Sequence, residues 1–205
     1  MKNKNQVPLP YNLVANRHRG MGGQFVFTIL QLIRIAAVAL LFAPIPLTLR
    51  LLLLYVADII DCFVIHRIWK PTPDSKNVVV IAPIDCAGYD YQSRDKIVDT
   101  IVYIVVMAYL WAMHPSPLNY VLLGLLLYRT VGVAQFLRTG DKIYIVRYPD
   151  LFREFSLVVA LMHDGYFHPR SWITLGAIFL AIAIGKTGVE YYHHIVLSPS
   201  DKANP

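Results

Sequence analysis

Four aspartates lie inside or at the head of strongly apolar stretches, where carboxylates are not expected. Asp58 and Asp61 are three residues apart in "LLLLYVADIIDCFVIHR", and Asp95 and Asp99 are four apart in "YQSRDKIVDTIVYIVVM". Side chains three or four residues apart share one face of a helix, so each pair can point in one direction. A carboxylate in hydrocarbon costs about 2.5–3.5 kcal/mol on the insertion scale. Four of them placed close together also repel one another.

A bound cation would remove both penalties. Carboxylate oxygens are hard ligands that suit Mg²⁺ or Mn²⁺, and such ions keep open positions for water and a substrate phosphate. Two ions would neutralise the four acids and hold a phosphoryl group between them. A plainer alternative exists for Asp95 and Asp99, because the helix dipole favours acids in the first turn of a helix.

The composition indicates what positions these acids. Of the 205 residues, 56% are hydrophobic and 16% charged, which is typical of a polytopic membrane protein. A transmembrane helix needs about 20 mostly apolar residues. We therefore predict an all-α membrane domain of six transmembrane helices, at about 25–43, 47–66, 96–113, 118–137, 149–167 and 172–192. The fifth of these carries charged residues at its start.

The segments outside the spans complete the expected organisation. Residues 1–24 would form an N-terminal segment, either an interfacial helix or a basic tail, and 25–197 the six-span domain with a loop at about 68–94. Residues 198–205 would be a tail. Lysines and arginines gather before the first span and after the second and fourth, whereas "APIP" and "HPSP" carry none. This asymmetry predicts a multi-pass integral protein with both termini and the acids on the cytoplasmic side.

The net charge is +6, which favours contact with anionic lipid headgroups or phosphate-bearing substrates. Nucleic acid is not an expected partner, because no soluble basic domain is available to hold it. The lipid bilayer is the partner that the composition itself implies.

The two aspartate pairs resemble the signature of the CDP-alcohol phosphatidyltransferase family. That signature reads DxxDGxxAR, then a spacer, then GxxxDxxxD, on the second and third of six spans. "DIIDCFVIHR" matches the first half at Asp58 and Asp61, and "YQSRDKIVD" matches the second half at Asp95 and Asp99. Six expected spans and a length near 200 residues agree with the resemblance.

The resemblance implies an enzyme that moves a phosphatidyl or phospho-alcohol group from a CDP-linked donor to an alcohol and releases CMP. Asp58, Asp61 and Asp95 would bind two Mg²⁺ or Mn²⁺ ions that hold the diphosphate of the donor. Asp99 would act as general base on the acceptor hydroxyl. The donor would be CDP-diacylglycerol or another CDP-alcohol, the acceptor is an unspecified alcohol, and a homodimer is the expected assembly.

Several positions depart from the family signature. Cys62 stands at the first glycine, residues 65–66 stand at Ala-Arg, and Tyr91 stands at the second glycine. Arg67 comes one residue after the family arginine and is assigned to the substrate. These departures leave open an inactive relative. A small cation- or proton-coupled transporter is a further alternative, which predicts acids spread along a path through the membrane rather than gathered at one side.

Polar and basic residues within the spans are the remaining candidate substrate contacts. An intramembrane arginine is costly unless it meets an acid, a phosphate or a headgroup. Gln31 and Arg34 lie one turn apart, where the family has a polar residue and an arginine, and are expected on the nucleotide side. Snorkelling is the alternative for Arg34. A cationic pocket for phosphate is expected from Arg129, Arg138 and Arg153, because guanidinium groups bind phosphate at two points.

Overall fold

The computed structural model describes residues 21–68 and 89–192, and every regular element in these two ranges is helical. The all-α fold is therefore confirmed for this part of the chain. The expected N-terminal segment, most of the expected loop at 68–94 and the tail at 198–205 lie outside the described residues. The elements are α2 (Met21–Ala37), η2 (Val38–Phe42), α3 (Leu47–Ile68), α4 (Tyr89–Met113), α5 (Leu118–Thr139), α6 (Ile143–Arg147), α7 (Phe152–His163) and α8 (Trp172–Tyr191).

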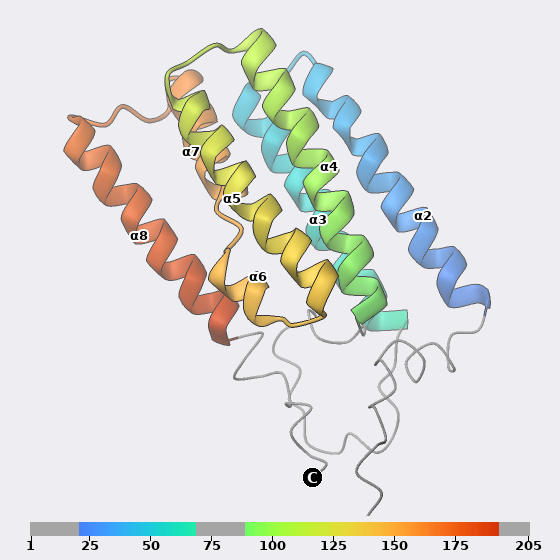
Figure 1. Cartoon of the computed structure of the whole chain (residues 1–205). Coiled ribbons are helices and arrows are strands. Elements are labelled where there is room, and N and C mark those ends of the chain that lie inside the picture. The colour runs from blue at the N-terminus through green and yellow to red at the C-terminus, as the bar shows by residue number, and fades with distance from the viewer. Residues whose placement is uncertain (1–20, 69–88, 193–205) are drawn as a thin grey trace, which may run out of the picture.

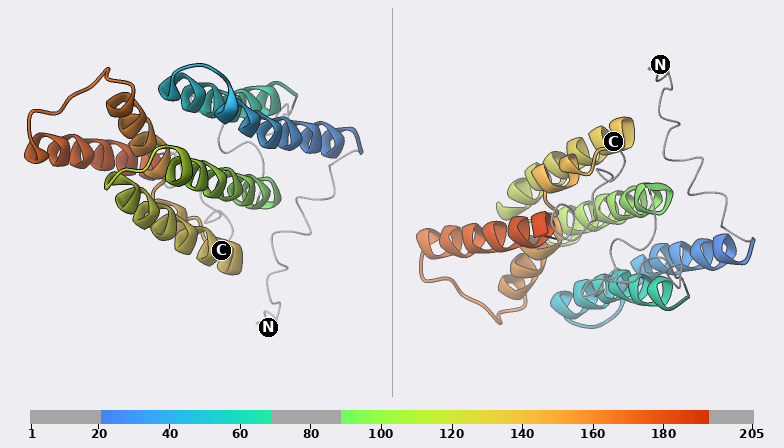
Figure 2. Two further views of the ribbon diagram at one scale, coloured as in Figure 1. Left: turned by 90° about the horizontal axis from the view of Figure 1, so that it is seen from above. Right: turned by 90° about the horizontal axis from the view of Figure 1, so that it is seen from below.

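The long helices run side by side in a bundle whose neighbours are mostly antiparallel (Figure 1). The connection at 43–46 joins η2 to α3, and the connection at 114–117 joins α4 to α5. Each connection contains two prolines, which lack an N–H and cannot continue the preceding helix. Viewed along the bundle, α2 and α3 lie on one side of α4, and α8 lies on the side farthest from α2 (Figure 2).

Three helices are long and apolar enough to span a membrane, namely Ser93–Met113 within α4, Leu118–Thr139 and Trp172–Tyr191. Thr28–Phe42 is a shorter apolar helix. Helix α3 has 22 residues, but Arg50 and two aspartates interrupt its apolar sequence. The structure thus supports three of the six expected spans, and the others remain predictions.

The fifth expected span, 149–167, differs from a single long helix. Its helical part, α7, has 12 residues, which at 1.5 Å per residue gives about 18 Å against a hydrocarbon core of about 30 Å. The short helix α6 and Pro149 precede it, and Gly165, with a φ of 77°, follows it in the left-handed region. The charged residues at the start of this segment form the polar contacts described below.

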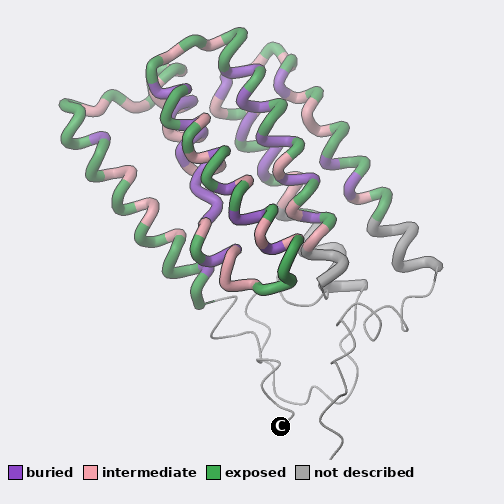
Figure 3. The backbone as a smooth tube through the Cα atoms, in the orientation of Figure 1, coloured by how far each residue is buried: buried purple, intermediate pink, exposed green. Residues whose placement is uncertain are grey.

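The core consists of apolar side chains from η2, α3, α4, α5 and α7. Figure 3 shows that the buried residues lie mainly on the inner faces of these elements. In contrast, most of α8 is exposed on the isolated chain, although Leu175 is buried and Phe179, Ile182 and Ala183 pack against the core. The most completely buried members of the core are Leu41, Leu51, Val106, Leu110, Leu122, Phe136, Phe152 and Ala160.

Candidate functional site

Three of the four predicted aspartates converge at one end of the bundle. Asp58 comes from α3, and Asp95 and Asp99 come from the start of α4. One carboxylate oxygen of each lies within 4.8 Å of the other two, which is close enough for a single metal ion. We call these three residues the aspartate cluster. The side chain of Asp61 lies outside the described part of the structure, as does that of Arg67.

Arg34 of α2 lies in the middle of the aspartate cluster. Its guanidinium is 2.5 Å from Asp58 Oδ1, donates to Asp95 Oδ1 at 2.6 Å, and is also paired with Asp99 Oδ1. Gln31, one turn earlier on the same helix, accepts a hydrogen bond from Arg34 at 3.4 Å. Only 4% of Arg34 is exposed, so this arginine is a counter-ion of the acids rather than a snorkelling side chain.

Two further cations complete the charge balance of the cluster. Lys96 Nζ lies 2.9 Å from Asp95 Oδ2 and 3.1 Å from Asp99 Oδ2. Arg153 of α7 donates to Asp58 Oδ2 at 2.8 Å. All six carboxylate oxygens therefore face a cationic side chain, and three negative charges meet three positive ones. Lys96 is not among the residues expected at this site, although it directly follows an aspartate and lies three residues before another.

The donor set of the cluster fits a hard divalent ion, because it consists of convergent carboxylate oxygens. The same three carboxylates are already in contact with Arg34, however. A metal ion and Arg34 therefore compete for one position. The site can hold the ion only if the guanidinium moves to another anion.

A small cavity of about 10 Å³ adjoins the cluster, which is room for about one water molecule. Asp58 and Asp99 line it, but Asp95 does not. A nucleotide does not fit in this cavity, whereas a single hydroxyl group does. The complete lining is Arg34, Leu54, Tyr55, Asp58, Asp99, Val102 and Tyr103.

The three arginines expected to form a phosphate pocket do not share a set of contacts. Arg153 belongs to the aspartate cluster. Arg129 is buried and donates to the carbonyl oxygens of Ile145 at 3.2 Å and Tyr148 at 2.5 Å, so it fixes the segment between α6 and α7. Arg138 is exposed in the last turn of α5. The separation follows from the chain path, because α6 lies between α5 and α7 and takes up the hydrogen bonds of Arg129.

A second buried polar layer links α4, α7 and α8. Tyr103 donates to Asp150 Oδ2 at 2.5 Å, and the backbone N–H of Asp150 donates to Glu190 Oε1 at 3.0 Å. Lys186 pairs with Glu154 at 2.8 Å. These contacts attach the otherwise exposed α8 to the bundle. The sequence signal for them was a carboxylate in the last turn of an apolar helix, at Glu190.

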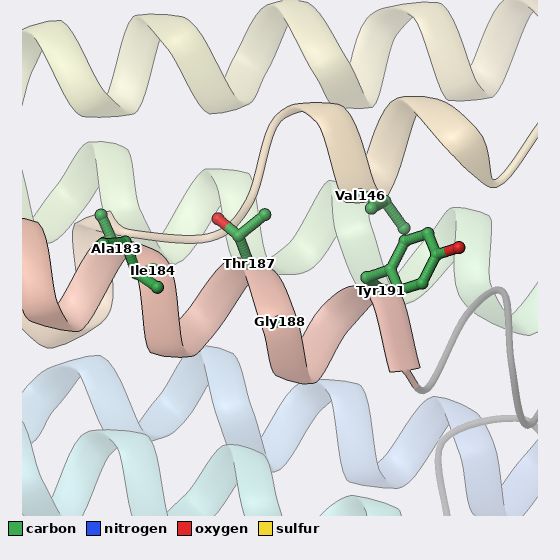
Figure 4. Close-up of a pocket in the computed structure, with 6 residues that line it drawn as sticks. All are labelled: Val146, Ala183, Ile184, Thr187, Gly188 and Tyr191. Carbon is green, nitrogen blue, oxygen red and sulfur yellow. The ribbon is translucent and has the colours of Figure 1, made fainter.

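A groove of about 490 Å³ lies between α6 and α8, as Figure 4 shows. It is nearly all apolar, and the lining that the structure describes includes no carboxylate, imidazole or cationic group. The groove can therefore accommodate an apolar group, but its described lining offers no side chain for acid–base or metal chemistry. The lining residues are Val146, Ala183, Ile184, Thr187, Gly188 and Tyr191.

No protein-family model, no characterised protein and no solved structure matches the chain. The functional interpretation is therefore carried by the residues of the site alone.

Proposed function

We propose that the chain is a membrane transferase of CDP-alcohol phosphatidyltransferase type, which moves a phosphatidyl or phospho-alcohol group from a CDP-linked donor to an alcohol. The observation that carries the proposal is the convergence of three carboxylates from two helices, each at a position of the DxxD and DxxxD pairs. Ionisable residues within transmembrane segments are rare and mark functional sites, so three carboxylates that meet at one point support a site for a multiply charged ligand.

The proposed reaction is a displacement at phosphorus. The acceptor hydroxyl oxygen forms a bond to the phosphorus that carries the alcohol group of the donor. The bond from that phosphorus to the bridging oxygen breaks, and CMP leaves with the electron pair. The hydroxyl proton passes to Asp99, which lines the cavity where a hydroxyl fits.

Asp58 and Asp95, together with Asp61 on sequence grounds, would hold the divalent ions. When bound, the ions would neutralise the diphosphate and the charge that develops on the leaving group. Arg34 would then turn from the aspartates to a phosphate oxygen of the donor. A guanidinium can do this because its N–H groups form paired hydrogen bonds with phosphate as well as with carboxylate. Arg153 can stay with Asp58, because it contacts Oδ2 of that carboxylate, whereas Arg34 contacts Oδ1.

Asp99 can serve as a base only after this rearrangement. Both of its oxygens face cations, Arg34 and Lys96, so neither oxygen is free to accept a hydrogen bond from an acceptor hydroxyl. Departure of Arg34 would free Oδ1 of Asp99, a residue that lines the cavity. Donor binding and activation of the base are thereby coupled.

An inactive relative is the second candidate, and one observation favours it. The cluster is already neutral without a metal, because three cations match three acids. Such a site could serve stability alone. A transporter is less well supported, because Asp58, Asp95 and Asp99 meet at one point rather than following one another along a path across the bundle.

A CMP-release assay separates these proposals. Purified protein in lipid nanodiscs would be supplied with CDP-diacylglycerol, CDP-choline or CDP-ethanolamine, a panel of alcohols and Mg²⁺ or Mn²⁺. We expect CMP release that needs the metal and one alcohol, and that is lost in Asp58→Asn. Absence of release with every donor and alcohol, together with no effect of metal on thermal stability, would support the inactive relative.

A further inference from the structure

Two histidines face each other at the opposite end of the bundle from the aspartate cluster. His114 follows the last residue of α4, and His163 is the last residue of α7. His114 Nδ1 lies 2.9 Å from His163 Nε2, and the rings are nearly perpendicular, at 77°. His114 comes fifteen positions after Asp99, which at 1.5 Å per residue of helix is about 22 Å. The pair is therefore independent of the proposed transferase site.

The outer ring nitrogen of each histidine has its own partner. His163 Nδ1 lies 3.2 Å from Asp164 Oδ1, and the other oxygen of Asp164 accepts the backbone N–H of Thr48 at 2.7 Å. His114 Nε2 lies 3.4 Å from the hydroxyl of Tyr109. A carboxylate on Nδ1 fixes the proton of His163 there and turns the lone pair of Nε2 toward His114.

The 2.9 Å contact is a hydrogen bond when His114 carries its proton on Nδ1. His114 can also carry its proton on Nε2, because the Tyr109 hydroxyl can either donate to this nitrogen or accept from it. If the proton moves to Nε2, the lone pairs of Nδ1 and Nε2 point at each other. Two facing lone pairs repel unless a cation lies between them.

We propose that His114 and His163 bind a borderline divalent transition metal such as Zn²⁺ between these two nitrogens. Zinc–nitrogen bonds of about 2.0–2.1 Å in tetrahedral geometry place two ligand nitrogens about 3.3 Å apart, so the rings need to separate by only about 0.4 Å. Nitrogen ligands select this class of ion, whereas the oxygen ligands of the aspartate cluster select Mg²⁺ or Mn²⁺.

The surroundings of the pair match those of known metal-binding histidines. Such histidines generally donate their other ring N–H to a carboxylate, as His163 does to Asp164. The His163 side chain is 47% exposed, which gives the ion a path from solvent and leaves positions for water ligands. The bound ion would join the end of α4 to the end of α7 and, through Asp164, to the start of α3.

Zinc binding to the purified full chain tests the proposal. Zn²⁺ would be titrated calorimetrically with Mg²⁺ in large excess, so that the aspartate cluster is supplied with its own type of ion. We expect one zinc site per chain in the wild type. His114→Gln and His163→Gln should each weaken it at least about tenfold, and Asp164→Asn by about 10–100-fold, the usual effect of removing an outer-shell partner.

His168→Gln is the matched control, because His168 is an exposed histidine of the same connection. Its zinc affinity should equal that of the wild type. Equal weakening in His168→Gln, or wild-type binding that neither His114→Gln nor His163→Gln affects, would overturn the proposal. X-ray absorption at the zinc edge of the wild type is independent of any variant. Scattering from two imidazoles is expected, and ligation by oxygen alone would exclude the site.

Discussion

Arg34 on α2 and Asp95 on α4, 61 residues apart in the chain, meet at 2.6 Å in the interior of the bundle. Arg34 is 4% exposed and Asp95 is 8% exposed, so neither charge is compensated by bulk water. All three acids of the aspartate cluster contact this one guanidinium. The packing of α2 against α4 therefore depends on the contact between Arg34 and the aspartate cluster.

We predict that Arg34→Met destabilises the metal-free protein by about 3–5 kcal/mol, the cost of leaving buried charges without their partner. Saturating Mg²⁺ or Mn²⁺ should restore more stability to this variant than it adds to the wild type, because the competing cation is gone. Thermal unfolding with and without metal measures both effects. Arg138→Met, at an exposed arginine, should change stability by no more than about 0.5 kcal/mol. Equal metal responses in Arg34→Met and wild type would contradict the competition.

The contact between Asp58 and Arg153, at 2.8 Å, predicts an energetic coupling between α3 and α7. Each side chain is a little over one-fifth exposed, so solvent screens the pair only in part. A double-mutant cycle of Asp58→Asn and Arg153→Met should give a coupling of about 0.5–3 kcal/mol. Stability losses that simply add in the double variant would show that the contact contributes nothing.

Gly132 is predicted to be intolerant of a side chain. A Cβ at this position would lie 2.3 Å from Tyr148 Cβ, and the carbonyl of Tyr148 accepts from Arg129. Gly132→Ala should therefore cost about 1–3 kcal/mol, as overpacking usually does. Gly124→Ala is the control in the same helix, because its Cβ meets nothing within 4 Å. That change should stabilise the helix by up to about 1 kcal/mol. Similar melting temperatures for the two variants would refute the close approach of α5 to Tyr148.

The convergence of Asp58, Asp95 and Asp99 was predictable from the sequence. Helical spacing and the order of the apolar runs determine which acids lie at the same depth in the membrane. The sequence did not predict that Arg34 pairs with the aspartates. A motif suggests which ligand a residue binds, but it does not show which side chain the residue contacts when the ligand is absent. The sequence also placed Arg129 with Arg153, because both are arginines near the same ends of expected spans. The structure separates them through the five-residue helix α6, which is too short to give a periodic signal.

The spans show a similar limit. Composition identifies α4, α5 and α8 as long apolar helices, whereas the segment 149–167 carries Asp150, Arg153, Glu154 and Asp164 and forms only a 12-residue helix. Pro149 before this helix and Gly165 after it, together with polar contacts such as that of Asp150 with Glu190, accompany its short length. The histidine pair was also invisible, because 49 residues separate its members and no spacing rule joins them.

Metal-free stability should fall at acidic pH through His114. Its burial lowers the pKa of this imidazole, and the neighbouring His163 and Arg50 lower it further, while Asp164 acts in the opposite direction. Below about pH 6.5 the unfolded chain therefore binds a proton more readily than the folded chain, and folding stability decreases. Above that pH this group has no effect. Melting temperatures in a chelator between about pH 8 and pH 5 should fall more steeply for the wild type than for His114→Gln. Parallel curves would show that His114 has no part in the pH dependence.

Asp99 should differ functionally from Asp95, although both carboxylates face Arg34 and Lys96. The difference lies in the cavity, because Asp99 lines the space where a hydroxyl fits and Asp95 does not. If Asp99 is the base, Asp99→Asn should lower CMP release by about 10²–10⁴-fold, the usual value of general-base assistance. Its affinity for metal and CDP-diacylglycerol should stay within about twofold of the wild type, because the ions keep their other ligands. Asp95→Asn should instead weaken metal binding, because a ligand charge is lost.

The two substitutions are equal in size and charge change, so each is the control for the other. Equal loss of metal affinity in both variants would make Asp99 another ligand. Undiminished turnover in Asp99→Asn would assign the base to a different residue.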